Sequence, residues 1–250
     1  MRTEALDVFM ELIVKSNYIV ALTGAGISTN SGIPDFRGPG GLYSREDLPF
    51  ERLFSIEYFR GNPFFFYSNF SEILKSINNA LPNKGHLFLK KLEDLGRLKV
   101  IITQNIDELH KKAGNSCVIE LHGNLSRFVC LSCNNEVKRE SDEYSLILDK
   151  ALLGNVPACF KCGGVLKPDV VFFGEYVHDL EKALTEVQRA DLLLTMGTSL
   201  TVYPASTLPS YISETAKLVI INNQPTPYDE KAKVVLHDDI DTIVEKLKIL

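Results

Sequence analysis

The stretch GAGISTNSGIPDFRG spans residues 24–38 and directly follows the apolar run 18–22. A strand that leads into a Gly-x-Gly turn is typical of a dinucleotide-binding unit, in which backbone N–H groups approach the phosphates. Thr29 replaces the third glycine of the usual Gly-x-Gly-x-x-Gly pattern. The acidic residue that a dehydrogenase uses for the ribose is expected about 20 residues further on. Because that segment, 38–51, reads as loop, the pattern indicates a nucleotide site unlike that of a dehydrogenase.

Apolar runs alternate with helical patterns along the rest of the chain, and we predict further strands at 98–103, 117–121, 170–173, 192–196 and 218–221. Predicted helices fall at 86–95, 106–113, 178–190, 204–216 and 239–249. Short continuous apolar strands are typical of a parallel sheet covered on both faces. We therefore expect an α/β fold with a doubly wound, parallel, Rossmann-like sheet and a ligand at the carboxyl ends of its strands.

Two segments interrupt this alternation. Residues 38–84 begin with a Gly/Pro-rich loop and continue as an aromatic-rich helical insertion, and residues 123–167 contain four of the five cysteines. We expect both segments to form a smaller lobe, with the large nucleotide-binding domain made of residues 1–37, 85–122 and 168–250.

Two Cys-x-x-Cys pairs are the strongest local signal in the chain: Cys130 with Cys133, and Cys159 with Cys162. Two such pairs complete a tetrahedral site of four thiolates, which predicts one structural zinc ion per chain with no open position for catalysis. The segment between the pairs, 134–158, is longer than the roughly 15–20 residues of the common pattern, so a small helix is expected there. Two redox dithiols, or unrelated core cysteines, are the alternatives.

The composition is that of an ordinary globular enzyme of 250 residues, with 45% hydrophobic and 24% charged residues. A net charge of −5 argues against direct nucleic-acid binding or an anionic membrane surface. The first twenty residues form an amphipathic, acidic helical pattern unlike a targeting segment, and we expect a cytoplasmic protein. A monomer is the expected assembly, although no residue pattern determines it. Cys117 is expected to pack in the core.

Polar residues follow two of the predicted strands. Gln104, Asn105 and Asp107 come directly after the strand 98–103, although Asp107 could equally cap the following helix. His122 follows the strand 117–121 and is the best placed of five histidines for proton transfer at the ligand edge.

Asn222 and Asn223 follow the strand 218–221 and are candidates to hold a ribose. An ordinary turn ahead of Pro225 is an equally good interpretation of these two residues.

Together these motifs resemble one family, the sirtuins, which are NAD-dependent protein lysine deacylases, and in particular their short bacterial and archaeal members. The resemblance covers almost the whole chain. The matching stretches are GAGISTNSGIPDFRG (24–38), TQNID (103–107), HGN (122–124), the two Cys-x-x-Cys pairs, KPDVVFFGE (167–175), GTSL (197–200) and NN (222–223).

The resemblance implies a set of residues that contact NAD. The pyrophosphate would lie against Gly24, Ala25, Gly26, Ser28 and Thr29. The adenosine side would lie against Gly197, Thr198, Ser199, Asn222, Asn223, Asp239 and Ile240. The nicotinamide and its ribose would be held by Ala25, Gln104, Asn105, Ile106, Asp107 and His122, with Asp35, Phe36 and Arg37 in a mobile cofactor-binding loop.

The resemblance also implies the reaction: deacetylation of acetyl-lysine with release of nicotinamide and O-acetyl-ADP-ribose. His122 would be the general base, and Asn105 would position ribose hydroxyls or a water molecule. A mono-ADP-ribosyltransferase and a longer-chain lysine deacylase are alternative enzymes. A zinc-ribbon binding module with an inert nucleotide fold is the alternative from another class.

The substrate implied by the resemblance is an acetylated protein bound as an extended peptide, by main-chain pairing with little side-chain readout. The expected substrate-binding residues are Val171, Phe173, Gly174, Glu175, Val202 and Tyr203, whereas Phe172 is expected to pack in the core.

The helical insertion bears on the preferred acyl group. Relatives that prefer acidic acyl chains carry a Tyr-x-x-Arg pair, and the apparent equivalent here runs from Tyr67 to Phe70 without an arginine. We expect acetyl and other neutral acyl groups to be preferred over succinyl.

Overall fold

A six-stranded parallel sheet forms the centre of the larger lobe in the computed structural model, which describes residues 2–35, 41 and 50–247. The strand order is β3-β2-β1-β7-β8-β9. The strands are β1 (Ile19–Thr23), β2 (Leu98–Thr103), β3 (Val118–Glu120), β7 (Leu192–Met196), β8 (Lys217–Ile221) and β9 (Val234–Leu236). All neighbouring pairs run parallel, which confirms the doubly wound fold, and β9 is the one strand of this sheet that the apolar pattern did not reveal.

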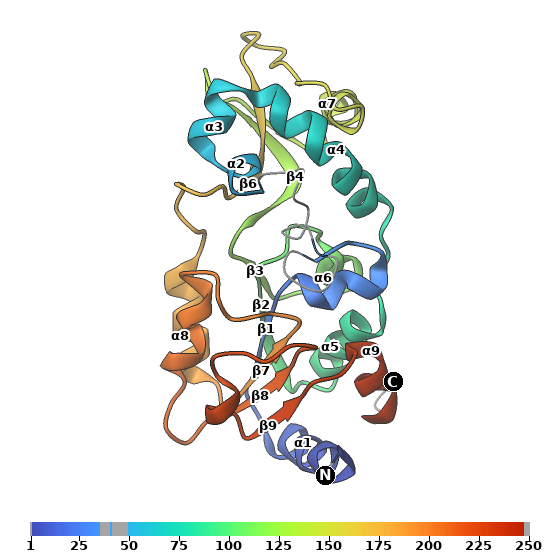
Figure 1. The fold of residues 1–250 in the computed structure, drawn as a ribbon, viewed down its shortest axis with the longest axis vertical. Helices are drawn as coiled ribbons and strands as arrows, with labels where there is room; N and C mark the ends of the chain where they lie inside the picture. The colour runs from blue at the N-terminus through green and yellow to red at the C-terminus, as the bar shows by residue number, and fades with distance from the viewer. Residues whose placement is uncertain (1, 36–40, 42–49, 248–250) are drawn as a thin grey trace.

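Helices cover both faces of the sheet, as Figure 1 shows. On one face lie α1 (Arg2–Lys15), α5 (Lys84–Asp94) and α9 (Ile240–Leu247), and on the other lie α8 (Leu180–Arg189) and the 3-10 helix η3 (Ala205–Tyr211). Successive side chains of β1 alternate between the two layers: Ile19 and Ala21 pack with α1 and α5, and Val20 and Leu22 pack with α8. Burial on both faces explains why the strands read as continuous apolar runs.

The smaller lobe combines the helical insertion with the cysteine-containing segment (Figure 1). The insertion supplies α2 (Phe50–Leu53), α3 (Ile56–Gly61) and α4 (Pro63–Asn79), and the cysteine-containing segment supplies α7 (Asp142–Leu152). A three-stranded antiparallel sheet has the order β5-β4-β6, from β4 (Gly123–Cys130), β5 (Glu136–Lys138) and β6 (Leu166–Val170). The helix α7 lies between the cysteine pairs, as their long spacing predicts. The described residues also form three short elements: η1 (Ala25–Ser31), α6 (Leu109–Lys112) and η4 (Asp229–Lys231).

Aromatic side chains hold the smaller lobe together. The rings of Phe66 and Phe70 stack with their centroids 4.8 Å apart, and Phe54 meets Phe172 edge-on at 5.5 Å. Phe172 is buried in this cluster, as predicted. Because large aromatic side chains bury much apolar surface, they give this small lobe a core of its own.

Three predictions of local structure are wrong. Residues 170–173 do not form a strand of the parallel sheet, because the strand there is β6, which ends at Val170 and pairs antiparallel with β4. Residues 204–216 form only the short 3-10 helix η3, which contains Pro209, a residue without a backbone N–H donor. Cys117 is exposed because it precedes β3, the edge strand of the sheet.

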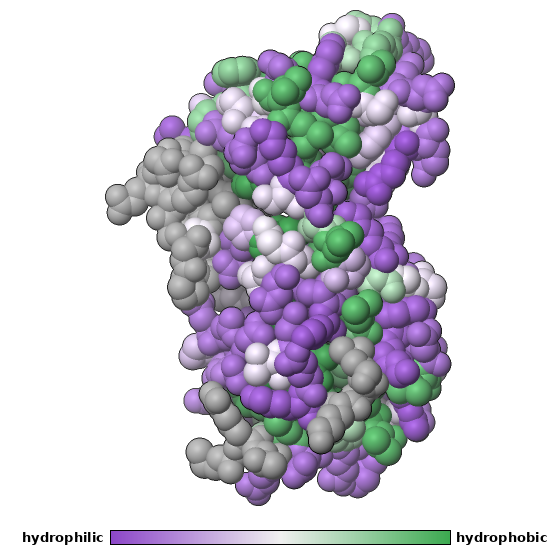
Figure 2. Space-filling model, turned by 90° about the vertical axis from the view of Figure 1, so that its right-hand side faces the viewer, coloured by the Kyte–Doolittle hydropathy of each residue, from purple (hydrophilic) through white to green (hydrophobic). Residues whose placement is uncertain are grey.

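The molecular surface on the side of α5 and α9 is mainly hydrophilic, with scattered hydrophobic patches, as Figure 2 shows. Among the described residues, none of the helices has the length and apolar character that crossing a membrane requires.

Candidate active site

A cavity of about 660 Å³ lies at the carboxyl ends of the parallel strands. The sheet places β1 between β2 and β7, so the chain leaves β1 toward one edge and later returns to build the other edge. In open α/β sheets this reversal of strand order creates a crevice in which ligands bind. The segments that follow β1, β2, β3, β7 and β8 all contribute residues to the cavity.

Every residue that the sequence predicts for the NAD and peptide sites, and that the structure describes, lines this one cavity. They are Gly24, Ala25, Gly26, Ser28, Thr29, Asp35, Gln104, Asn105, Ile106, Asp107, His122, Val171, Phe173, Gly174, Glu175, Gly197, Thr198, Ser199, Val202, Tyr203, Asn222, Asn223, Asp239 and Ile240. Phe36 and Arg37, which are also predicted to belong to the site, lie outside the described residues.

The glycines of the first turn are needed for the contact between two loops. The backbone N–H of Gly26 donates to the carbonyl oxygen of Gly197 over 2.8 Å. A Cβ atom on Gly26 would lie 2.9 Å from Gly197, and one on Gly24 would lie 2.8 Å from the Cβ of Thr198. Gly197 has a φ of 64°, and a Cβ atom there would meet the backbone of Ile27 at 2.2 Å. These contacts bring the turns after β1 and β7 together at the cavity wall.

A chain of hydrogen bonds joins Asn105 and Asp107 to the turn after β1. The Nδ2 of Asn105 donates to the Oγ of Ser28 over 3.1 Å, and Ser28 Oγ donates to Asp107 Oδ2 over 2.7 Å. All three residues are buried. Gln104 extends the contact toward β7, because its Nε2 donates to the Oγ1 of Thr198 over 2.9 Å.

The position of Asp107 is compatible with both of the roles considered from the sequence. Its Oδ1 accepts the backbone N–H of Leu109 over 2.9 Å at the start of α6, and its Oδ2 faces Ser28 in the cavity wall. Burial raises the pKa of this carboxyl above its ordinary value, and the hydrogen bonds from Ser28 and Leu109 oppose that shift. A buried carboxylate of this kind is suited to accept hydrogen bonds from an uncharged amide.

His122 lines the cavity, and its hydrogen bonding defines which ring nitrogen carries the proton. Its Nδ1 lies 2.9 Å from the carbonyl oxygen of Gln104, and because a carbonyl can only accept, Nδ1 carries the proton. The neutral ring therefore has an unprotonated Nε2. Burial lowers the pKa of His122, whereas the carbonyl of Gln104 opposes this shift and nearby His178 adds to it. Gly123, the residue after His122, has a φ of 70°. It allows the backbone of Asp169 to approach closely, because a Cβ atom on Gly123 would lie 2.1 Å from the carbonyl oxygen of Asp169.

An internal ion pair holds the predicted substrate-binding segment in place. The Oε2 of Glu175 accepts the backbone N–H of Phe172 over 2.8 Å and lies 2.9 Å from the Nζ of Lys167. Lys167 is buried, donates to the carbonyl oxygen of Val170 over 2.6 Å, and has its Nζ 4.2 Å from the ring centroid of Phe172. The carboxylate of Glu175 thus fixes the conformation of residues 171–175 through its contacts with Phe172 and Lys167.

The main chain of this segment is also tied to its neighbours. Val171 donates its N–H to the carbonyl oxygen of His122 over 2.9 Å, and Phe173 donates to the carbonyl oxygen of Phe54 over 2.7 Å. The side chains of Phe173 and Tyr203 remain 49% and 80% exposed at the cavity. Two aromatic side chains are therefore accessible to a bound chain.

At the turn after β8, both interpretations of Asn222 have a basis in the structure. Asn222 lines the cavity, yet its Nδ2 donates to the carbonyl oxygen of Gln224 over 2.7 Å within the turn. The carboxylate of Asp239 accepts hydrogen bonds from Asn30 Nδ2 over 2.7 Å and from the backbone N–H of Thr242 over 2.9 Å. These bonds link η1 to the start of α9.

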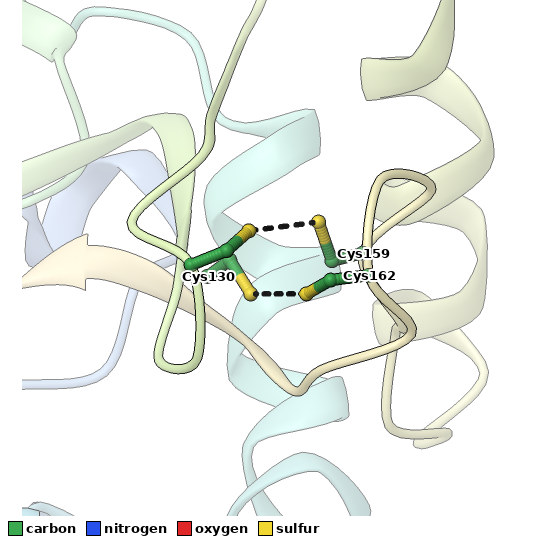
Figure 3. Close-up of side chains that lie close together, drawn as sticks. Cys130, Cys159 and Cys162 are labelled. Atoms are coloured by element: carbon green, nitrogen blue, oxygen red, sulfur yellow. Dashed lines mark hydrogen bonds between the residues drawn. The ribbon is translucent and has the colours of Figure 1, made fainter.

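The four cysteines of the two Cys-x-x-Cys pairs meet in the smaller lobe, and Figure 3 shows their sulfur atoms facing one another across two loops. The Sγ atoms of Cys130 and Cys162 are 3.5 Å apart, those of Cys133 and Cys159 are 3.8 Å apart, and all four lie within 4.8 Å of one another. A tetrahedral zinc ion with sulfur bonds of about 2.3 Å would separate its sulfur ligands by about 3.8 Å. The four thiols therefore fit zinc, with no ligand position left open.

Sequence reasoning missed the apolar part of the cavity wall. The lining residues that were not predicted to contact a ligand are the polar Gln224 and the apolar or aromatic Ile33, Pro34, Phe54, Ile73, Ile77, Val170, Phe172, Tyr176, Val177, Leu180 and Pro204. Phe70, considered from the sequence only for the acyl preference, also lines the cavity. Most of these lining residues come from the insertion and from the segments after β6 and β7, and nothing in their spacing separates a cavity wall from ordinary core. The aromatic-rich composition of 58–81 was the one available signal.

Residues 24–204 match the Sir2 family. An NAD-dependent protein deacetylase of Caldivirga maquilingensis is 45% identical over 243 residues, which cover 95% of this chain and 91% of that protein. An NAD-dependent protein deacetylase of Saccharolobus solfataricus is 44% identical over 238 residues, covering 95% of this chain and 93% of that protein.

Solved structures of Sir2 proteins have a similar fold. A Sir2 structure with a deacetylated p53 peptide and 3'-O-acetyl-ADP-ribose has a TM-score of 0.87 at 38% identity, covering 97% of this chain and 96% of that chain. A complex of Sir2, a p53 peptide and NAD+ has a TM-score of 0.86 at 38% identity, with the same coverage.

Proposed function

Because the chain belongs to the Sir2 family and is an NAD-dependent protein deacetylase, we propose that its large cavity is the active site, with His122 as the general base. The observation that carries this assignment is the Nδ1 contact of His122 with the carbonyl oxygen of Gln104. It leaves Nε2 as the basic nitrogen of a ring that lines the cavity.

NAD is consumed in the reaction: it supplies the ribose that receives the acetyl group, and nicotinamide leaves. The products are deacetylated lysine, nicotinamide and O-acetyl-ADP-ribose. The cavity suits such a co-substrate, because a glycine-rich turn, buried polar groups and an apolar wall meet in about 660 Å³. Nε2 of His122 would remove the proton of a ribose hydroxyl, so that this oxygen can accept the acetyl group.

The nicotinamide leaving group and the ribose would be held by the hydrogen-bonded side chains of Ser28, Asn105 and Asp107. We assign the nicotinamide carboxamide to Asp107 with Ala25 and Ile106, because an uncharged amide can donate to a buried carboxylate at low cost. Asn105 would position the ribose hydroxyls or a water molecule. Its side chain is fixed by the contact of Nδ2 with Ser28, so little conformational freedom is lost on binding.

The remaining NAD contacts are proposed on the position of each residue around the cavity. The turn after β1 would face the pyrophosphate, the turns after β7 and β8 would face the adenosine, and the segment that contains Asp239 and Ile240 would close over the adenine. Asp35 would belong to the cofactor-binding loop, together with Phe36 and Arg37.

One solved Sir2 structure is bound to an acetylated peptide, and another holds a p53 peptide together with NAD+. For this chain we propose an extended peptide that lies between Val171–Glu175 and Val202–Tyr203. The accessible rings of Phe173 and Tyr203 support this placement, and the Lys167–Glu175 pair would keep the first segment in one conformation.

The smaller lobe would hold one structural zinc ion at its four cysteines, and their clustered thiols suit a reducing, cytoplasmic environment. We propose a large domain of residues 1–37, 85–122 and 168–250, a cofactor loop and helical insertion at 38–84, and a zinc-binding module at 123–167. The sheet of the zinc-binding module continues into β6. A monomer that binds neither nucleic acid nor membrane is the simplest assembly.

Product analysis tests this function against the ADP-ribosyltransferase alternative. An acetyl-lysine peptide is incubated with the enzyme, with and without NAD, and the peptide and small molecules are analysed by mass spectrometry. We expect NAD-dependent loss of the acetyl group with equal amounts of nicotinamide and O-acetyl-ADP-ribose. A peptide that keeps its acetyl group and gains ADP-ribose would replace the deacetylase assignment by the transferase.

A further inference from the structure

Two histidines that play no part in the proposed chemistry lie against each other in the larger lobe. His86 on α5 and His110 on α6 are 0% and 2% exposed, and their ring centroids are 4.9 Å apart. Imidazole rings are seldom buried so completely without hydrogen-bond partners that fix them. The partners of this pair lead to the active site.

On one side the pair is anchored to the cofactor-binding turn. The Nδ2 of Asn83 donates to the carbonyl oxygen of Ile27 over 2.7 Å, which directs the Oδ1 of Asn83 to the Nδ1 of His86 at 2.9 Å. The backbone N–H of Asn83 also lies 3.3 Å from this nitrogen. Accepting that N–H would require an unprotonated Nδ1 and would leave an Nε2–H group buried without a partner, so the contact with the amide oxygen, which can only accept, assigns the proton to Nδ1.

On the other side the pair is connected to Asn105. The Nε2 of His110 lies 2.9 Å from the Oγ1 of Thr23, and the Thr23 hydroxyl donates to the Oγ1 of Thr103 over 2.9 Å. Because this hydroxyl uses its hydrogen on Thr103, Nε2 of His110 must be the donor to Thr23. Thr103 Oγ1 in turn accepts the backbone N–H of Asn105 over 3.0 Å.

Both rings are neutral, because burial lowers the pKa of His86 to about 4 and that of His110 well below its ordinary value. Each ring thus has one N–H group, already engaged with Asn83 or with Thr23. The two other nitrogens, His86 Nε2 and His110 Nδ1, have no hydrogen-bond partner among the described residues, as expected of unprotonated nitrogens. Native structures leave buried N–H groups unpaired less often than acceptors, which agrees with this assignment.

We propose that His110, packed against His86, is a positioning residue that fixes the main chain of Asn105 through the Nε2–H of its ring. The side chain of Asn105 donates to Ser28. Its backbone N–H donates to Thr103, which is connected through Thr23 to His110. Asn105 is thus fixed at two points. This inference rests on the role proposed for Asn105 in the deacetylase.

Paired amide substitutions separate this role from simple packing. In the glutamine side chain the amide nitrogen reaches the position of imidazole Nε2, whereas in asparagine it reaches that of Nδ1. His110→Gln keeps a donor for Thr23, and we expect its kcat within about threefold of the unmodified enzyme. His110→Asn loses that donor and should lower kcat about tenfold with little change in the KM for NAD, the loss that one net hydrogen bond explains.

At His86 the order should be reversed, because its Nδ1 is the nitrogen in use. His86→Asn should be tolerated and His86→Gln should not. If glutamine and asparagine have equal effects at His110, or asparagine is tolerated better there, the ring only fills space and the proposal is wrong.

Hydrogen exchange of the Asn105 amide provides a readout that needs no activity. We expect His110→Asn and the nearly isosteric Thr23→Val each to speed this exchange about tenfold, and the double variant to add little, because the two groups act in one chain. His110→Gln should leave the exchange unchanged. Unaltered exchange in both His110→Asn and Thr23→Val would overturn the proposal.

The two readouts also separate this proposal from the proposed function. An unmodified enzyme that fails to deacetylate refutes the function, while the exchange of Asn105 still reports on the histidine pair. If His110→Asn does not fold, Thr23→Val decides, since it removes one hydroxyl and leaves both rings in place.

Discussion

The ion pair of Lys167 and Glu175 gives a quantitative test of how the peptide-binding segment is held. Glu175→Gln keeps the shape of the side chain and removes the charge that faces a buried ammonium group 2.9 Å away. Removing one partner of a fully buried pair costs about 3–5 kcal/mol. The side chain of Glu175 is 30% exposed, so solvent screening reduces the expected loss of unfolding free energy to about 1–3 kcal/mol.

The pH dependence of this loss has a defined sign. Burial already lowers the pKa of Lys167, and Glu175 partly restores it. In Glu175→Gln that support is gone, so the folded state releases the Lys167 proton at a lower pH than the unfolded chain does. Stability rises with pH wherever the unfolded chain binds more protons. The deficit of the variant relative to the unmodified enzyme should therefore shrink as the pH rises toward the ordinary lysine pKa of about 10.4.

The assay is urea denaturation followed by circular dichroism, because the chain contains no tryptophan. It is combined with the steady-state KM for an acetyl-lysine peptide and for NAD. We expect the peptide KM to rise and the NAD KM to stay unchanged. Glu214→Gln, at an exposed carboxylate, is the matched control and should alter stability by less than about 0.5 kcal/mol.

A second substitution tests whether the two charges act as a pair. In Lys167→Met/Glu175→Gln no charge is left buried, so the double variant should be more stable than the sum of the single effects predicts. If Glu175→Gln unfolds within about 0.5 kcal/mol of the unmodified chain at pH 7 and keeps its peptide KM, the pair does not order the segment.

Three further predictions concern the metal, the base and the acyl group. Cys130→Ser, or a strong chelator, should unfold the smaller lobe, seen as proteolytic cleavage within 123–167, whereas Cys117→Ser should resist cleavage; intact protein after metal removal would contradict a structural zinc site. Because burial lowers the pKa of His122 and a base must be neutral, kcat should fall on acidification only below about pH 6.5; a fall centred above that value would contradict the assignment. An acetylated peptide should turn over at least about tenfold faster than its succinylated counterpart, since the cavity wall around Phe70 is apolar; equal rates would refute this preference.

Much of the fold could be predicted because buried parallel strands leave a clear signature. The runs 98–103 and 192–196 coincide with β2 and β7. The strands β4 and β5 could not be predicted from apolar runs, because their residues have mixed polarity in a small, partly exposed sheet. The run 170–173 was misassigned because an apolar stretch fits a parallel strand and a packed loop equally well.

The polar part of the site was predictable because each motif directly follows a strand, and parallel strands bring their carboxyl ends to one edge. Contacts between distant segments were not predictable in this way. The closeness of Gly26 to Gly197, the inward turn of Glu175 to Lys167, and the meeting of His86 with His110 all depend on tertiary packing. No spacing along the chain encodes them.

The account depends most directly on His122 acting after the nicotinamide bond has been broken. The measurement is made on His122→Ala with NAD, an acetyl-lysine peptide and isotopically labelled nicotinamide. Deacetylation and the incorporation of label into NAD are followed together. We predict that deacetylation falls at least about a hundredfold, as expected for loss of a general base, while label still enters NAD. Deacetylation at the unmodified rate, or loss of label incorporation together with deacetylation, would contradict the central claim.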